Sequence, residues 1–232
     1  MIGIICAEPE ELNEILKLME NTKKEKICSL EFVTGNILNT SCVVSLSGVG
    51  KVNAAMCVQT MILKYCPDLI LNIGVAGAIS EDVKIGDIVV GSGVIQHDFD
   101  VSAFPNRKKG EISGIGKVEI PCTQRITEKL KFSCRNIKEI NSHCGTILTG
   151  DQFINSTKIL SEIKNQFGGL VCEMEAGSIG QVCFINDIDF GIVKAVSDTA
   201  DNSSTIDFKT FIKQASKNCA KLLMEFIKLN QG

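Results

Sequence analysis

Apolar runs of strand length alternate with segments of helical periodicity along the whole chain. This alternation is typical of α/β domains, in which helices cover a central sheet. Several runs are continuously apolar, which indicates strands buried on both faces. We therefore expect an α/β fold of three αβα layers, with a central mixed β-sheet flanked by helices. The predicted strands are residues 3–7, 31–38, 42–47, 69–73, 88–96, 145–149, 170–173 and 190–196.

Three helices are predicted from apolar spacing. An apolar stripe at positions 12, 15, 16 and 19 follows Pro9, which is favoured at the first helical position, so Glu11 lies in the first turn. Residues 51–63 are rich in Ala, Val and Met and indicate a helix buried against the sheet. The last helix is expected to begin near Asp207 as its N-cap. Its predicted core face consists of Phe208, Phe211, Ile212, Ala215, Cys219, Leu222, Leu223, Phe226 and Ile227.

Length and charge limit the classes of protein and partner. The 232 residues contain no repeat, low-complexity tract or linker, so we expect a single domain over residues 1–232. The 24 basic and 27 acidic residues give a net charge of −3 without a block of like charge, which favours small molecules over nucleic acids or membranes as partners. The apolar run at the N-terminus lacks a basic flank and is too short for a signal peptide or a membrane span. We expect a cytoplasmic protein.

The eleven cysteines do not form a metal-binding pattern, because no two of them make a CxxC pair. Most lie inside apolar runs, and their odd number favours reduced thiols in a reducing compartment. The only histidines, His97 and His143, have no cysteine pair beside them. We therefore expect no bound metal.

Acidic residues gather at three predicted strand-to-helix turns, at residues 8–11, 173–175 and 198–201. Each group taken alone is typical of solvated charge or a helix N-cap. The carboxyl ends of parallel strands share one edge of a sheet, however, so Ala7, Glu173 and Val196 are expected to bring all three groups to one cleft. Such a cleft suits glycosidic hydrolysis, which needs one carboxylate to activate water and one carboxylic acid to protonate the leaving group.

Two glycine-containing segments, residues 47–50 and 74–78, are predicted to be turns whose backbone approaches a ligand. Neither completes a dinucleotide fingerprint or a P-loop. A phosphate would also be repelled by the nearby carboxylates. A nucleotide-phosphate site is therefore not indicated.

Seven short motifs and their order along the chain resemble those of the 5'-methylthioadenosine/S-adenosylhomocysteine nucleosidases of the purine nucleoside phosphorylase superfamily. The resemblance covers nearly the whole chain and implies a nucleoside phosphorylase-like fold. It also implies hydrolysis of the N-glycosidic bond of methylthioadenosine or S-adenosylhomocysteine, with no metal or organic cofactor. The motifs are IICA at 4–7 with Glu11, SGVGKV at 47–52, GVAG at 74–77, GDIVV at 86–90, GDQFIN at 150–155, EMEA at 173–176 and AVSDTAD at 195–201.

The resemblance implies a role for each polar residue of the site. Asp198 would donate a proton to N7 of adenine, Ser197 would orient Asp198, and Glu11 would activate the attacking water. Glu175 would bind the ribose hydroxyls, and Met174 would pack beneath the sugar. We expect burial, together with nearby Glu175 and Glu11, to raise the pKa of Asp198. The alternative for Asp198 is a helix N-cap.

The resemblance also implies contacts to the adenine and across a homodimer. Phe153 would stack on the base, the main chain of Ile154 would read its edge, and Phe104 would line the partner's site. The remaining residues expected at the substrate are Glu173, Val49, Val75, Ala76, Gly77 and Phe208.

Four positions depart from the family pattern. Glu8 replaces a Met of the pocket for the 5'-alkylthio group, and Val75 replaces a Ser whose hydroxyl is thereby lost. Lys194 replaces an Arg and cannot form a two-pronged contact with a carboxylate such as Glu173. Residues 105–108 lack an aromatic residue expected over the neighbouring subunit's site.

Three alternative functions are considered. A nucleoside phosphorylase is disfavoured, because residues 6–11 read CAEPEE rather than the Gly-Asp-Pro turn of those enzymes. A nucleosidase for a related nucleoside such as futalosine remains open. A catalytically silent nucleoside-binding protein is disfavoured, because Glu11 and Asp198 are both present.

Overall fold

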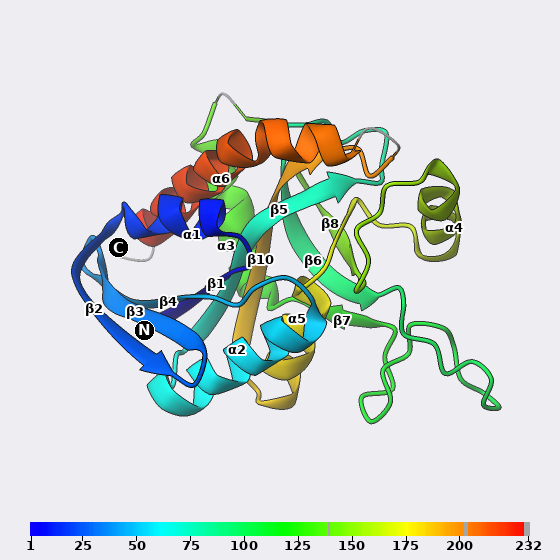
Figure 1. Ribbon diagram of the computed structural model, residues 1–232, viewed down its shortest axis with the longest axis horizontal. Coiled ribbons are helices and arrows are strands. Elements are labelled where there is room, and N and C mark those ends of the chain that lie inside the picture. Colours follow the sequence, from blue (N-terminus) through cyan, green and yellow to red (C-terminus); the bar gives the residue numbers. More distant parts are fainter. Residues whose placement is uncertain (139, 202–203, 230–232) are drawn as a thin grey trace.

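A curved, mixed β-sheet forms the centre of the computed structural model, which describes residues 1–138, 140–201 and 204–229 (Figure 1). The strands are β1 (Ile2–Cys6), β2 (Met19–Ile27), β3 (Leu30–Ile37), β4 (Thr40–Leu46), β5 (Leu69–Ala78), β6 (Ile88–Gln96), β7 (Glu119–Pro121), β8 (Ser142–Thr149), β9 (Val171–Glu173) and β10 (Asp189–Asp198). The helices are α1 (Pro9–Leu16), α2 (Lys51–Tyr65), α3 (Gln124–Arg135), α4 (Thr157–Phe167), α5 (Ala176–Ile185) and α6 (Ser204–Leu229).

The sheet has a parallel centre that closes into a ring on one side. Strands β4, β1, β5 and β10 lie parallel in that order, and β3 and β2 extend the sheet in antiparallel fashion beyond β4. On the other side β10 pairs with β6, β6 with β8, β8 with β9, and β9 returns to β5. The mixed sheet predicted from the sequence is confirmed, and the ring is an added feature.

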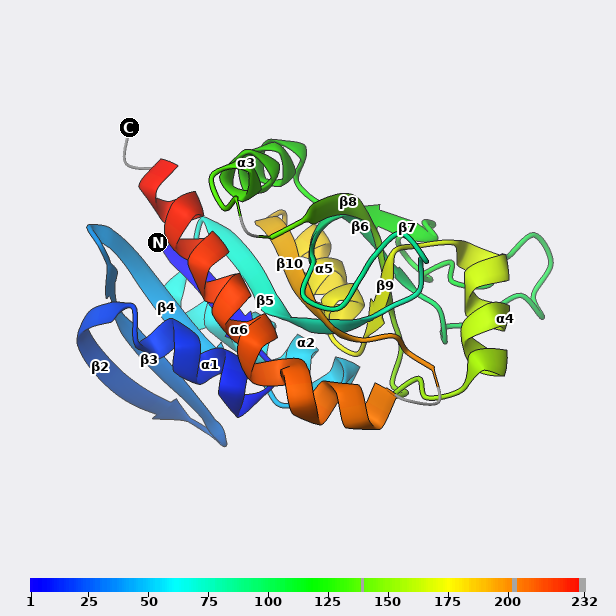
Figure 2. The ribbon, with the colours of Figure 1, turned by 90° about the horizontal axis from the view of Figure 1, so that it is seen from above.

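Helices cover both faces of this sheet, as the sequence predicted (Figures 1 and 2). Helices α1, α3 and α6 pack on one face around a core that includes Ile15, Leu130 and Phe226. Helices α2 and α5 pack on the opposite face around a second core that includes Met61 and Ile179. Helix α4 lies at one end, over a smaller third cluster.

The last helix begins earlier than predicted. Helix α6 is described from Ser204, so Asp207 lies in its first turn and is not its N-cap; residues 202–203 lie outside the described structure. Its core face is also narrower than predicted, because Phe211 is 38% exposed whereas Phe226 is fully buried. A stripe of apolar positions over seven turns drifts around a straight helix, which leaves the first part of the stripe at the edge of the core.

The first helix is shorter than predicted, and it leads into a strand that the sequence analysis missed. Helix α1 ends at Leu16, and Met19, the fourth residue of the predicted stripe, begins β2. Strand β2 has the sequence MENTKKEKI and is exposed along most of its length. Charged, lysine-rich sequences of this kind are typical of edge strands, which must not pair with other chains.

Strand β5 continues to Ala78, so the predicted turn at residues 74–78 is wrong. The glycines in this stretch serve close approach rather than chain reversal. A Cβ atom on Gly74 would lie 2.7 Å from Oε1 of Glu11, and one on Gly77 would lie 2.6 Å from Oδ1 of Asp198. The two glycines thus admit two carboxyl groups against the backbone of one strand.

Truncation of Phe226 tests the packing of α6 on the sheet. Phe226→Ala is expected to lower the free energy of unfolding by about 3–5 kcal/mol, because it leaves a cavity in the core. The measurement is denaturant unfolding at equilibrium. Phe211→Ala on the same helix is the control and should cost less than about 1 kcal/mol. Equal losses for the two variants would contradict the placement of α6.

Candidate active site

A cavity lies where the parallel strands β1, β5 and β10 end, beside the turns that follow β4, β8 and β9. Its empty volume, including the open mouth, is about 690 Å³, within the size range of small-molecule sites. All three predicted acidic groups contribute to it. The lining residues are Ala7, Glu8, Glu11, Val49, Val75, Ala76, Gly77, Gln152, Phe153, Ile154, Cys172, Glu173, Met174, Glu175, Ser197, Asp198, Ala200 and Phe208.

Glu173 reaches the cavity by a route that the sequence analysis did not predict. Strand β9 has three residues and runs antiparallel to β5, with Cys172 opposite Gly77. Its carboxyl end therefore does not belong to the edge formed by the parallel strands. It meets that edge because the ring of strands curls β9 over the last residues of β5.

Glu11 is buried and held by three backbone amides. Its Oε2 accepts hydrogen bonds from the N–H groups of Ala7 (2.8 Å) and Glu8 (3.1 Å), and its Oε1 accepts one from Val75 (2.9 Å). Burial raises the pKa of Glu11, although nearby Lys194 and the three amides oppose this shift. The carboxylate is therefore fixed in orientation and more basic than a solvated glutamate.

Asp198 owes its position to a β-bulge. Val196 pairs with Ala76 and Asp198 pairs with the next residue, Gly77, so Ser197 is an extra residue in β10. Bulges re-aim side chains beside active sites. Here the Ser197 hydroxyl donates to Oδ2 of Asp198 at 2.9 Å, and the backbone N–H of Ala200 donates to Oδ1, also at 2.9 Å.

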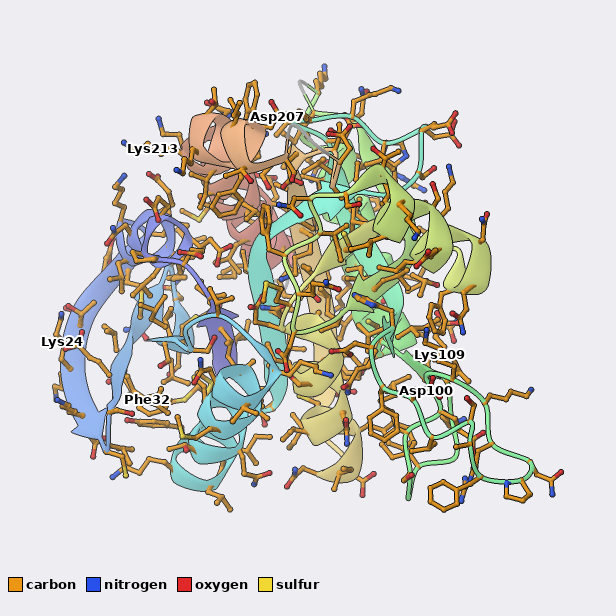
Figure 3. The ribbon with its side chains drawn as sticks, turned by 45° about the vertical axis from the view of Figure 1, so that its right-hand side comes forward. Lys24, Phe32, Asp100, Lys109, Asp207 and Lys213 are labelled. Atoms are coloured by element: carbon orange, nitrogen blue, oxygen red, sulfur yellow. The ribbon has the colours of Figure 1, made fainter. Side chains whose placement is uncertain are left out.

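The pKa of Asp198 is raised, as predicted from the sequence. Burial is the main cause, and the hydrogen bonds from Ala200 and Ser197 partly oppose it. The acidic neighbours that add to the shift are Asp207 and Asp201. The expected contribution of Glu175 and Glu11 is thus replaced by carboxylates nearer the start of α6, where Figure 3 shows Asp207.

Glu173 forms an ion pair with Lys194 at the base of the site. The distance from Lys194 Nζ to Glu173 Oε2 is 2.8 Å, and the two side chains are 1% and 3% exposed. The other oxygen, Oε1, accepts the hydroxyl of Thr149. Oε2 also accepts the backbone N–H groups of Glu175 (3.0 Å) and Ala176 (2.8 Å). Lysine contacts one carboxylate oxygen and threonine the other, whereas an arginine could contact both.

Glu175 is buried beside this ion pair and faces the cavity. Its Oε1 accepts a hydrogen bond of 2.8 Å from the backbone N–H of Gly50, in the turn before α2. Burial and the charge of Glu173 raise the pKa of Glu175 to about 8, against the opposing effect of Lys194.

Apolar side chains form the rest of the wall. The rings of Phe153 and Phe208 meet edge to face, with centroids 5.8 Å apart. Met174 is half-buried beside Glu175, and Ile154 is buried. A planar aromatic base fits a wall of this kind.

Of the predicted substrate-contacting residues, only Phe104 lies outside the cavity lining. It is 67% exposed and belongs to the long connection between β6 and β7, on which Figure 3 labels Asp100 and Lys109. This connection extends away from the body of the protein (Figure 1).

Several lining residues were missed by the sequence analysis. They are Gln152, Cys172 and Ala200, whereas Ala7 and Glu8 were expected at the cleft but were given no contact with the substrate. Each lies next to a predicted residue, so the rule that whole strand ends and turns form such sites could have found them. Among the described residues, no group of three or more His, Cys, Asp or Glu residues is arranged to hold a metal ion.

The arrangement places two buried carboxyl groups at separate points of one cavity. Glu11 lies against Gly74 and Asp198 against Gly77, positions that are three residues, or roughly 10 Å, apart along β5. Glu175 and Met174 lie on the turn from β9 into α5. The space can hold a small ligand with one polar ring between the carboxyl groups and a flat ring by the phenylalanines.

Relatives of known activity match the chain over its whole length. The profile of the family described as "Phosphorylase superfamily" matches residues 1–228. The 5'-methylthioadenosine/S-adenosylhomocysteine nucleosidase of Oceanobacillus iheyensis is 36% identical over 228 residues, with 98% of each chain covered. The enzyme of that name from Bacillus subtilis is 34% identical over 232 residues, again with 98% of each covered.

Solved structures of such enzymes also superpose closely on this chain. The nucleosidase of that name from Neisseria meningitidis, in complex with methylthio-immucillin-A, superposes with a TM-score of 0.95 at 32% identity and 98% coverage of both chains. The futalosine hydrolase of Helicobacter pylori superposes with a TM-score of 0.93 at 29% identity, covering 98% of this chain and 97% of the other. The chain therefore belongs to the phosphorylase superfamily and, within it, to the 5'-methylthioadenosine/S-adenosylhomocysteine nucleosidases.

Proposed function

We propose that the protein hydrolyses the N-glycosidic bond of 5'-methylthioadenosine and S-adenosylhomocysteine, releasing adenine and the corresponding 5-thioribose. The observation that carries the proposal is the pair of buried carboxyl groups, Glu11 and Asp198, held against one strand in a cavity of nucleoside size. Membership of the nucleosidase family supports the substrate class. The reaction needs no cofactor, because the base, the acid and the water suffice.

Asp198 is the general acid in this mechanism. A raised pKa keeps a proton on the carboxyl group to higher pH, and the proton passes to N7 of adenine as the glycosidic bond breaks. Ser197 fixes the orientation of Asp198 through its hydroxyl. A protonated purine is a better leaving group, so adenine departs with the electron pair of the glycosidic bond and leaves the sugar as an oxocarbenium-like species.

Glu11 activates the attacking water. Its oxygens are aligned by the amides of Ala7, Glu8 and Val75, and burial increases its basicity. The water loses a proton to Glu11 as its oxygen bonds to C1' of the sugar. The negative charge of Glu11 also stabilises the developing positive charge on the sugar ring.

Contacts along the wall bind the substrate. Glu175 accepts hydrogen bonds from the ribose hydroxyls, Met174 packs beneath the sugar, and Phe153 stacks on adenine with Phe208 behind it. The main chain of Ile154 reads the edge of the base. The backbone of Val49, Val75, Ala76 and Gly77 lies close to the ligand, and Glu173 supports the site through its ion pair with Lys194.

A phosphorylase reaction fits this cavity poorly. The three arginines of the chain, Arg107, Arg125 and Arg135, are absent from the described lining, which includes five acidic residues. A phosphate dianion in this position would face like charges in a buried site. Water is uncharged and meets no such repulsion.

Futalosine is the second candidate substrate, because the futalosine hydrolase of Helicobacter pylori has a closely similar structure. Assays with both nucleosides separate the two candidates.

Several features support a homodimer in the cytoplasm. Val52, Met56 and Leu63 form an exposed apolar stripe along α2, and Phe104 is exposed on the long connection after β6. A second copy would bury such a stripe, and Phe104 would then line the partner's 5' pocket.

The eleven cysteines are free thiols, which suits a reducing compartment. Among the described helices, none is long and apolar enough to cross a membrane.

The first test concerns the nucleophile. Incubation with methylthioadenosine in phosphate-free buffer is expected to release free adenine, and Glu11→Gln should lower kcat by roughly 10²-fold or more with ligand binding largely retained. Chromatography of the products gives the measurement. A requirement for phosphate or a sugar 1-phosphate product would contradict water as the nucleophile. Full activity of the variant would contradict Glu11 as the base that activates it.

The second test concerns the acid. Asp198→Asn should fold normally and bind substrate, yet lose on the order of 10²- to 10⁴-fold in kcat, because Asn cannot deliver a proton. The variant should also lose the fall in kcat that the parent shows as pH rises through the raised pKa of Asp198. Asn caps helices as well as Asp does. Activity within a few-fold of the parent, at matched melting temperature, would therefore mean that Asp198 serves as a helix N-cap and not as the general acid.

The third test concerns the dimer. Light scattering at micromolar concentration should give the mass of two chains, and Phe104→Ala should raise KM for methylthioadenosine, because it removes an apolar contact from the partner's pocket. Phe132→Ala, which alters another exposed phenylalanine, is the control. A fully active monomer contradicts the dimer, and an unchanged KM in Phe104→Ala contradicts the role of that residue.

A further inference from the structure

Three polar residues next to the cavity, which we call the polar cluster, form a closed ring of hydrogen bonds. They are Lys51 at the start of α2, Asp98 after β6 and Asp151 after β8. Lys51 Nζ donates to Asp98 Oδ1 at 2.7 Å, and the backbone N–H of Asp151 donates to Asp98 Oδ2 at 2.9 Å. The backbone N–H of Lys51 donates to Asp151 Oδ1 at 2.7 Å, which closes the ring.

None of these three side chains lines the cavity, but the residues beside them do. Gly50 directly precedes Lys51, and its N–H holds Oε1 of Glu175 at 2.8 Å. Residues 152–154 directly follow Asp151 and form part of the wall with the phenylalanine pair. The polar cluster therefore joins the side of the site that carries Glu175 to the side that carries Phe153.

Electrostatic attraction stabilises the polar cluster. The side chains of Lys51 and Asp98 are 17% and 29% exposed, so their contact is partly shielded from water. Burial opposes the charge of Asp98, but hydrogen bonds from Lys51 and from the Asp151 amide outweigh it and lower the pKa of Asp98. Both aspartates also lie near the amino end of α2, where the helix dipole favours negative charge.

We infer that Asp98 is a positioning residue for nucleoside binding: it couples Lys51 to Asp151 and so fixes the distance between Glu175 and the wall at residues 152–154. The inference rests on the proposed function, since it takes Glu175 as the ribose-binding group. Asp98 does not touch the substrate. It acts through the backbone of Gly50 on one side and the backbone of Asp151 on the other.

A change in the titration of Glu175 follows from this coupling. The Gly50 N–H stabilises the charged form of Glu175 and lowers its pKa. The other groups that act on Glu175 are Glu173 from β9 and Glu11 from α1, which raise the pKa, and Lys194 from β10, which lowers it. A loosened polar cluster withdraws the Gly50 N–H, so we expect the pKa of Glu175 to rise further.

The experiment measures the Kd of methylthioadenosine by calorimetry as a function of pH in an Asp198→Asn background, in which turnover is slow and position 198 does not titrate. Adding Asp98→Asn is expected to weaken binding roughly tenfold, the equivalent of one charge-assisted hydrogen bond. The midpoint at which binding improves with rising pH should move upward. Lys51→Met should do the same, whereas Lys51→Arg, which keeps the cation, should restore most of the affinity.

Controls separate positioning from general loss of structure. Lys228→Met removes a surface ion pair with Glu225 on α6 and should change neither Kd nor the midpoint. In the double variant Asp98→Asn/Lys51→Met, the loss should be smaller than the product of the single losses, because both remove the same contact. An unchanged Kd and midpoint in Asp98→Asn, or equal losses in Lys51→Arg and Lys51→Met, would overturn the inference. Absence of hydrolysis by the parent would instead overturn the proposed function, while the binding data would still decide the role of Asp98.

Discussion

The buried ion pair between Lys194 and Glu173 is the interaction on which the site depends. Lys194 is almost fully buried, and burial alone would lower its pKa, yet the carboxylates of Glu173, Glu175 and Glu11 raise it overall. In return, the cation partly offsets the rise that burial causes in the pKa values of Glu11 and Glu175. One lysine thus makes it possible to bury several carboxyl groups around a single cavity, and its removal would leave uncompensated charge in the core.

The second requirement is space beside β5. Two glycines of this strand leave room for carboxyl groups that come from opposite ends of the sequence, one on α1 and one on β10. The bulge at Ser197 then turns Asp198 toward the cavity and supplies its hydroxyl partner. Strand β5 therefore supports both carboxyl groups, Glu11 beside Gly74 and Asp198 beside Gly77.

Much of the site could be predicted from the sequence, because strand ends in an α/β sheet are predictable from apolar runs and because short motifs around them resemble a known family. The less predictable parts depend on long-range pairing. Strand β2 was missed because it is a polar edge strand, and the orientation of β9 depends on a ring that no local pattern reveals. Helices α3 and α4 were not predicted although apolar spacing marks them. The polar cluster of Lys51, Asp98 and Asp151 joins three segments that are distant in sequence, so only the fold brings it together.

The position of Lys194 also separates Asp198 from the other carboxyl groups of the cavity. Lys194 and Asp198 lie on the same strand, four residues apart, yet the lysine is not among the main influences on Asp198, whose charged neighbours are Asp207 and Asp201. Near the lysine, the cation partly offsets the rise that burial causes in the pKa values of Glu11 and Glu175. Near Asp198, burial and negative neighbours favour the proton. In the proposed mechanism, the base Glu11 thus lies where the lysine partly compensates its charge, and the acid Asp198 lies where burial and negative neighbours act without it.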